Sequence, residues 1–190
     1  GDNIFYGHGL TTLLRNAVRE VEEENVASVF AYYVEDPQRY GVVEFDENGH
    51  AISLEEKPKE PKSNYAVVGL YFYPRGVSQY AKQLKPSWRN ELEITDLNAM
   101  YLSEGRLNVE IMGRGFAWFD TGTVDSLLEA AEFVKTVQKR QGIVISSPEE
   151  IAYNNRWISK EQLIQAAEKY GKSEYGKYLK RVAEGKIIYR

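Results

Sequence analysis

Hydrophobic positions alternate between helical and strand spacing along the first half of the chain. Apolar residues three and four positions apart predict an amphipathic helix over about residues 9–24. A nearly continuous apolar run follows over residues 26–34, rich in β-branched and aromatic residues, which is typical of a strand buried on both faces. A helix followed by a buried strand is half of a parallel α/β unit.

The next segments predict a hairpin and further strands. Residues 40–45 and 51–56 flank an Asn-Gly turn, and such a turn favours a β-hairpin. The pattern then indicates strands at 65–73 and 107–112, with helices between and after them. These further helices are expected just after residue 76, over 92–104 and over 123–138.

From residue 147 onward the chain changes character to short helical segments rich in charges and tyrosines. Ser147, Pro148 and Glu150 have the spacing of a capping box, and Ser159 with Gln162 repeats it. The pattern therefore predicts a mixed α/β sheet flanked by helices, in a Rossmann-like arrangement over residues 1–140, with a helical tail over 141–190.

Composition narrows the possible functions. The chain has 190 residues, of which 43% are hydrophobic, and this is enough for a real core. A net charge of −4 argues against a nucleic-acid partner, and no apolar run is long enough to span a membrane. There is no cysteine, which excludes a cysteine nucleophile, and two histidines make a histidine-rich metal site implausible. With no signal peptide visible, the expected location is the cytoplasm.

Two aspartates are candidate metal ligands. We expect Asp2 to end a strand that leads through a loop into the first helix, and Asp120 to end an aromatic strand before a Thr-Gly-Thr turn. Ligands bind at such strand ends in open α/β sheets, and carboxylate oxygens suit Mg²⁺. The alternative for Asp120 is a cap on the helix that begins near Val124.

A second group of candidates could bind a sugar phosphate. Because side chains alternate along a strand, Glu55 and Glu56 face opposite ways, and one carboxylate can accept sugar hydroxyls beside Lys57. Arg89 is a candidate anion clamp, and Tyr40 with Gly41 could line a sugar. The alternatives are an ordinary charged hairpin exit and a surface arginine.

Taken together, these segments resemble the glucose-1-phosphate thymidylyltransferases of the sugar nucleotidyltransferase family. The resemblance covers essentially the whole chain and rests on the segments 1–8, 36–45, 53–58, 61–73, 91–96, 112–123, 140–142, 148–152 and 175–179. The Glu-Glu-Lys-Pro element at 55–58 is common to several sugar nucleotidyltransferases. Its combination with the Pro-Lys-Ser-Asn-Tyr-Ala-Val run at 61–67 is more specific to the thymidylyl type.

The resemblance implies a function and a set of site residues. The reaction is transfer of dTMP from dTTP to glucose-1-phosphate, giving dTDP-glucose and pyrophosphate in dTDP-sugar (dTDP-rhamnose) biosynthesis. Mg²⁺ is the implied cofactor, held by Asp2 and Asp120. The residues implied around the sugar phosphate are Tyr40, Gly41, Glu56, Lys57, Val67, Tyr71, Arg89 and Trp118, with Lys57 and Arg89 as catalytic groups.

The resemblance also implies regulation and assembly. A second, inhibitory site for a dTDP-sugar is expected at Tyr6, Gly7, Gly113, Arg114, Glu150 and Ile151. Relatives are typically homotetramers, so a homo-oligomer is expected, with residues 141–190 as its oligomeric or regulatory region and 1–140 as the sugar-phosphate and metal part.

The first residues of the chain lead to two further expectations, on activity and on base choice. It opens at Gly1 without methionine, like the middle of something longer, and lacks the family's glycine-rich triphosphate loop. We therefore expect the chain alone to be inactive, and base choice to lie in that missing segment. The alternatives are a uridylyl or adenylyl enzyme, or a non-catalytic module for sugar-phosphate binding or oligomerisation.

Overall fold

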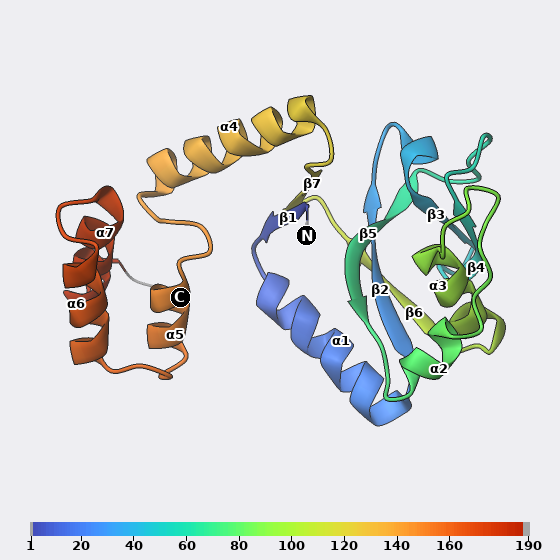
Figure 1. Cartoon of the computed structure of the whole chain (residues 1–190), viewed down its shortest axis with the longest axis horizontal. Coiled ribbons are helices and arrows are strands. Elements are labelled where there is room, and N and C mark those ends of the chain that lie inside the picture. The colour runs from blue at the N-terminus through green and yellow to red at the C-terminus, as the bar shows by residue number, and fades with distance from the viewer. Residues whose placement is uncertain (1, 188–190) are drawn as a thin grey trace. The chain divides into compact units, whose positions relative to one another are not determined.

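The computed structural model describes residues 2–187, which divide into two compact units at Gly122 and Thr123. The first unit contains the strands and three helices, and the second contains only helices (Figure 1). The sequence pattern predicted a division at residue 140 instead. In the structure the helix after Gly122 groups with the tail, and a functional boundary at 140 stays a prediction.

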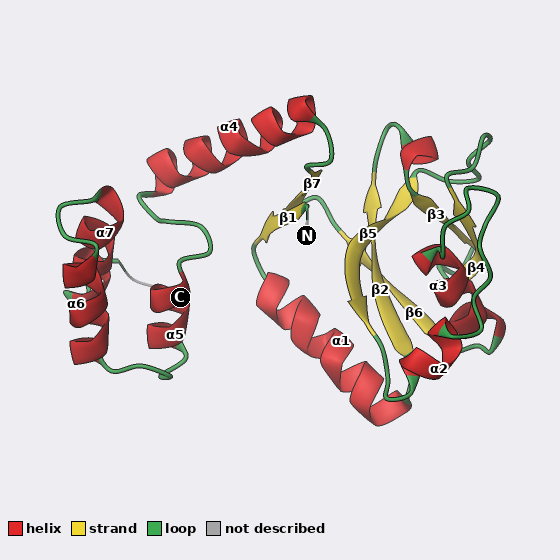
Figure 2. Cartoon of the chain, in the orientation of Figure 1, coloured by secondary structure: helices red, strands yellow, loops and turns green. Residues whose placement is uncertain are grey.

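The first unit is built on a mixed five-stranded sheet in the order β4-β3-β5-β2-β6 (Figure 2). Its strands are β2 (Ala27–Tyr33), β3 (Gly41–Phe45), β4 (Ala51–Glu56), β5 (Tyr65–Phe72) and β6 (Leu107–Met112). β2 runs parallel to β6 and antiparallel to β5, while β3 and β4 form the expected antiparallel hairpin. The predicted Rossmann-like α/β architecture with a helical tail is therefore confirmed.

Helices cover both faces of this sheet because β2 is apolar on both sides. Phe30 of β2 packs with Ala17 of α1 (Leu10–Glu24), while Ala27 packs with Leu97 of α3 (Ile94–Ser103). The short helix α2 (Val77–Ala81) joins the α3 side, and a 3-10 turn, η1 (Pro37–Arg39), precedes β3. Burial of β2 on both faces confirms the interpretation of its apolar run.

A separate two-stranded ribbon pairs the beginning of the chain with residues far along it. β1 (Asn3–Gly7) runs antiparallel to β7 (Phe116–Asp120), with Asn3 opposite Asp120. Asp120 ends its strand as predicted. A strand ending at Asp2 would lie before the described residues and stays a prediction. Asp2 itself immediately precedes β1, and its backbone carbonyl accepts hydrogen bonds from Thr121. The expected loop from Asp2 to the first helix was wrong, because the chain after Asp2 forms the strand β1, which pairs with β7.

The second unit contains α4 (Val124–Gln141), α5 (Pro148–Asn154), α6 (Lys160–Lys169) and α7 (Glu174–Ala183). Its core gathers buried side chains of α6 and α7, with Leu163 and Leu179 fully buried. The capping box of Ser159 and Gln162 is confirmed. At Ser147 only half of the predicted box forms: Ser147 accepts from the Glu150 backbone, but the Glu150 carboxylate accepts from the Tyr178 hydroxyl instead.

Candidate functional site

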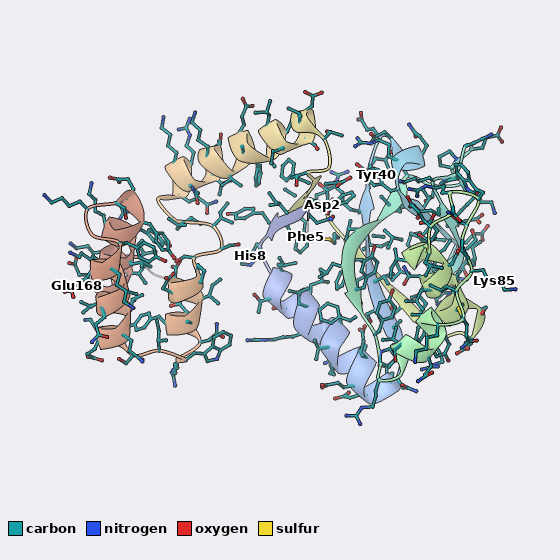
Figure 3. The ribbon with its side chains drawn as sticks, viewed as in Figure 1. Asp2, Phe5, His8, Tyr40, Lys85 and Glu168 are labelled. Carbon is teal, nitrogen blue, oxygen red and sulfur yellow. The ribbon has the colours of Figure 1, made fainter. Side chains whose placement is uncertain are left out.

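The candidate metal ligands belong to the region of the β1–β7 ribbon: Asp2 immediately precedes β1, and Asp120 ends β7 opposite Asn3. Figure 3 marks Asp2 where the chain enters β1. The Asp2 carboxylate Oδ1 accepts from the Asn3 amide at 3.0 Å, and the side chain of Asp2 is exposed. Asp120 does not cap the following helix, because Thr123 is the N-cap and forms a capping box with Ser126. Asp120 is therefore available for another role next to Asp2.

These carboxylates fit the needs of a magnesium ion. Among residues 2–187 no group of three or more His, Cys, Asp or Glu side chains could hold a metal by themselves. Mg²⁺ is commonly bound through only one or two carboxylates, with waters and substrate phosphates completing its shell. An exposed aspartate just before β1 and a second aspartate at the end of the paired strand β7 are compatible with that pattern.

Asn3 organises the ribbon around these aspartates. Its carbonyl Oδ1 accepts from the indole Nε1 of Trp118 at 2.5 Å and from the backbone N–H of Gly69 at 3.4 Å. Its amide meanwhile donates to Asp2. A Cβ at position 69 would stand 2.6 Å from the Asn3 Nδ2, so the close approach requires glycine there. Asn3 thus connects Asp2, Trp118 and Gly69.

Aromatic side chains link the ribbon to the hairpin strands. The Tyr40 ring meets the Trp118 ring edge-on at 5.1 Å between centroids, and the Tyr32 ring also meets the Trp118 ring edge-on, at 5.9 Å. Burial raises the pKa of Tyr40, and the nearby carboxylates of Asp36 and Asp120 raise it further against the opposing effect of Arg39. Tyr40 therefore connects Asp120 with the loop before β3, where Figure 3 labels it.

Gly41 and Glu56 stand opposite each other on β3 and β4. The Lys57 backbone N–H donates to the Tyr40 carbonyl at 2.9 Å, which closes the end of the hairpin. A Cβ on Gly41 would lie 2.6 Å from Thr95 Oγ1 and 3.2 Å from Glu56 Oε2. Glycine is required here because the Thr95 hydroxyl reaches across to Glu56.

The Glu56 carboxylate is held from two sides. Thr95 Oγ1 donates to its Oε2 at 2.5 Å, and Arg89 Nη1 donates to its Oε1 at 3.4 Å. Glu55 lies on the other face of β4, where it lines a small hollow with Val42 and Lys62. The predicted division of the two glutamates between opposite faces is confirmed.

Tyr71 lies close to this carboxylate as well. Burial raises the pKa of the Tyr71 hydroxyl, and the negative charge of Glu56 raises it further. Tyr71 therefore keeps its proton beside Glu56.

The remaining predicted sugar-phosphate residues differ in their exposure. Val67 is buried in the core on the same strand as Tyr71, and Lys57 is exposed with a φ of 44°. The structure thus brings together Tyr40, Gly41, Glu56, Tyr71 and Arg89, joined to Trp118 through Tyr40.

The residues expected at an inhibitory site fall in both units. Gly7 pairs with Phe116, and the Phe116 ring fills the space that a Cβ on Gly7 would need. Gly113 and Arg114 are exposed in the turn before β7. Glu150 and Ile151 lie on α5 of the second unit, where burial raises the pKa of Glu150 while the Tyr178 hydrogen bond lowers it in part.

Three residues of this arrangement carried no sequence signal. Asn3, Glu93 and Thr95 contact candidate site residues, but their partners Trp118, Arg89 and Glu56 are fixed by the tertiary fold. Only their position inside the segments 1–8 and 91–96, on which the resemblance rests, could have drawn attention to them.

Comparison with known structures first defines the class of fold. The crystal structure of UDP-glucose pyrophosphorylase complexed with UDP-glucose aligns with a TM-score of 0.61 over 71% of this chain and 54% of that chain, at 23% identity. A Bacillus anthracis protein in complex with a sucrose, described as a glucose-1-phosphate thymidylyltransferase, aligns with a TM-score of 0.58 over 70% of this chain and 51% of its own, at 42% identity. The fold is that of a sugar nucleotidyltransferase.

Sequence comparison then gives the family. The sequence model of the nucleotidyl transferase family matches residues 1–137, and the chain belongs to this family. A glucose-1-phosphate thymidylyltransferase of Xanthomonas campestris pv. campestris (strain B100) is 56% identical over 97% of this chain and 61% of the relative. The Mycobacterium tuberculosis (strain ATCC 25618 / H37Rv) protein of that name is 54% identical over 97% of this chain and 62% of its own length.

The similarity to glucose-1-phosphate thymidylyltransferases that the motifs indicated is thus confirmed. The chain spans about three fifths of the length of these curated relatives, 61% and 62%. Among the described residues, no helix is both long enough and apolar enough to cross a membrane.

Proposed function

We propose that the protein to which these residues belong transfers dTMP from dTTP to glucose-1-phosphate, giving dTDP-glucose and pyrophosphate. The observation that carries the proposal is the grouping of Tyr40, Gly41, Glu56 and Arg89 at one end of the hairpin. This grouping lies in a chain that matches, over 97% of its length, a relative named for this reaction.

The site residues can divide the work of binding. Glu56 has both carboxylate oxygens held by donors and can still accept hydroxyl protons of a sugar. Trp118 and Tyr40 offer aromatic faces, while Tyr71 keeps a hydroxyl donor beside Glu56. Lys57 and Arg89 are the proposed groups for the phosphate, Lys57 as a point charge and Arg89 as a planar fork.

In the proposed reaction, a phosphate oxygen of glucose-1-phosphate attacks the α-phosphorus of dTTP. The bond from that phosphorus to the bridging oxygen breaks, and pyrophosphate leaves with the electron pair. When Mg²⁺ is bound, it supplies positive charge for the phosphates. Asp2 and Asp120 are the proposed ligands, and Asn3 orients the first of them. Lys57 and Arg89 would offset charge on the phosphate as bonds change.

Regulation, assembly and location form a further part of the proposal. Tyr6, Gly7, Gly113, Arg114, Glu150 and Ile151 are proposed to bind a dTDP-sugar inhibitor. We also propose a homo-oligomer, with a homotetramer as the expected form, in the cytoplasm. The runner-up activities are uridylyl and adenylyl transfer, which use the same sugar-phosphate residues.

The proposal is tested by joining these residues to the segment of the Xanthomonas campestris relative that the chain does not cover. Pyrophosphate release is measured with glucose-1-phosphate, Mg²⁺ and dTTP, UTP or ATP in turn, alongside the 190-residue chain alone. We expect turnover of dTTP by the chimera and loss of that turnover on Glu56→Ala. Because the added segment is the one expected to choose the base, the chimera tests nucleotidyl transfer to glucose-1-phosphate rather than the choice among dTTP, UTP and ATP. A chimera that folds but is inactive with all three would favour a non-catalytic module.

A further inference from the structure

The guanidinium group of Arg89 contacts three carboxylates at once. Its Nη2 lies 2.7 Å from Glu91 Oε2, and its Nη1 lies 3.4 Å from Glu56 Oε1 and 3.5 Å from Glu93 Oε1. Three carboxylates and one guanidinium leave an excess of two negative charges around Arg89, the residue proposed to bind the phosphate. A phosphate cannot approach Arg89 favourably unless one of these carboxylates gives way.

The three carboxylates differ sharply in how they are held. The Glu93 side chain is 9% exposed and accepts from the Ser87 hydroxyl at 2.7 Å, and that hydroxyl also accepts from the Arg89 backbone N–H. Glu56 is 19% exposed and accepts from Thr95. Both carboxylates therefore belong to hydrogen-bonded networks that reach beyond Arg89.

Glu91, in contrast, is 57% exposed. Its backbone is fixed, because the Glu91 carbonyl accepts from the Ser87 backbone N–H at 2.8 Å, so only the side chain has to turn away. Exposed ion pairs contribute little to stability, whereas breaking a buried pair leaves an uncompensated charge. Of the three carboxylates, Glu91 is the one that can be exchanged at low cost.

We propose that Glu91 is an exchangeable counter-ion that occupies Arg89 Nη2 until a phosphate replaces it, while Glu93 and Glu56 keep Nη1 and hold the guanidinium in place. This inference rests on the proposed sugar-phosphate site and assigns it a specificity element. Glu91 selects for ligands with a doubly charged phosphate, because a neutral sugar gains nothing from displacing it. Glu93 is a positioning residue for Arg89.

The inference is tested on the 190-residue chain by titration calorimetry with inorganic phosphate, glucose-1-phosphate and glucose. Glu91→Gln should tighten binding of both phosphates by up to about fivefold, the range of an exposed pair, and leave glucose unchanged. Glu93→Gln should weaken both phosphates, since Arg89 loses a buried partner. Glu47→Gln, which removes an equal charge in the exposed turn between β3 and β4, is the matched control and should change nothing.

Side-chain NMR of labelled arginine provides the second measurement. The Arg89 guanidinium signals should shift on addition of inorganic phosphate, and they should begin closer to the phosphate-bound position in Glu91→Gln. Equal effects of Glu91→Gln and Glu47→Gln would overturn the inference. So would weaker phosphate binding by Glu91→Gln, equal gains for glucose and the phosphates, or phosphate binding that leaves the Arg89 signals unmoved.

Failure of the inference and failure of the proposed function give different results. If the chimera transfers dTMP but Glu91→Gln does not tighten phosphate binding, the inference fails and the function stands. If Glu91→Gln tightens phosphate binding and the chimera transfers no nucleotide, the exchange stands and the function fails. If neither the wild-type chain nor Glu91→Gln binds phosphate at Arg89, the inference fails, and turnover by the chimera alone decides the function.

Discussion

Asn3 accepts a hydrogen bond from the indole of Trp118 at 2.5 Å, although 115 positions separate the two residues. This contact joins the beginning of the chain to the aromatic strand that ends at Asp120. Breaking it leaves the half-buried indole N–H without this acceptor, which costs about 1–3 kcal/mol.

A double-mutant cycle of Asn3→Ala and Trp118→Phe measures this contact. We expect each single change to lower the free energy of unfolding, and the pair to show a coupling of about 1 kcal/mol in urea titrations. Asn3→Ala combined with Trp88→Phe is the control, because Trp88 is 84% exposed. Additive effects in the first pair would show that the two side chains do not interact.

The proposed sharing of one metal ion by Asp2 and Asp120 predicts matched effects at these two aspartates. Because Asp2 precedes β1 and Asn3 lies opposite Asp120, we expect their carboxylates within about 6 Å, close enough to share one Mg²⁺. Asp2→Asn and Asp120→Asn should each weaken Mn²⁺ binding, followed by electron paramagnetic resonance, while Asp96→Asn on the exposed side of α3 should not. A crystal structure with these carboxylates more than about 10 Å apart would exclude a shared ion.

The two faces of β4 predict unequal roles for neighbouring charges. In the chimera, Lys57→Ala should weaken use of glucose-1-phosphate far more than Glu55→Ala, because Glu55 lines the opposite hollow. Since Lys57 has a φ of 44°, part of the loss could come from the backbone. Lys57→Gly relaxes the backbone and should be equally impaired if the ammonium group matters. A larger effect at Glu55 would show that the other face binds the sugar phosphate.

Close packing at Gly41 predicts that a single methyl group disturbs the Glu56 carboxylate. The added Cβ would lie 2.6 Å from the Thr95 hydroxyl, whose residue is 4% exposed and has little room to move. We expect Gly41→Ala to lower the free energy of unfolding by about 1–3 kcal/mol, measured by urea denaturation. Gly115→Ala is the control, as nothing lies within 4 Å of its Cβ. Equal stability of the two variants would contradict the packing.

The buried pair of Glu150 and Tyr178 predicts a pH dependence in the helical tail. Burial raises the pKa of Glu150 above the ordinary value of 4.5, so the folded tail binds its proton more tightly than the unfolded chain does. The resulting stabilisation is complete below pH 4.5 and is lost as the pH rises through the raised pKa. Unfolding of residues 123–187 followed against pH should show this loss in the wild type. Glu150→Gln, which cannot ionise, should abolish it, whereas Glu161→Gln on exposed α6 should leave it intact.

Local patterns in the sequence predicted most of the elements, because those patterns depend on neighbours in the chain. The helix expected over 9–24 is observed at Leu10–Glu24, and the Ser159–Gln162 capping box forms as predicted. At Ser147 a tertiary contact prevailed instead: the Tyr178 hydroxyl, 28 positions away from Glu150, takes the carboxylate that the local pattern assigned to the cap.

The candidate site was predictable only in part, for the same physical reason. Strand alternation alone separates Glu55 from Glu56, and the aromatic strand does end at Asp120. The strand after Asp2 could not be anticipated, since its pairing partner lies more than 110 residues away. The contacts of Thr95 with Glu56 and of Glu93 with Arg89 likewise depend on where α3 packs against β4.

The close approach of Asn3 to Gly69 constrains the order in which this ribbon can change during evolution. A larger residue at position 69 collides with the same amide group that holds Trp118 and Asp2. Such a replacement requires the Asn3 amide to move away or to be lost, and either change deprives the indole and the aspartate of their common partner. Lineages that keep an aromatic donor at 118 are therefore confined to glycine at 69, and the three positions should vary together or not at all.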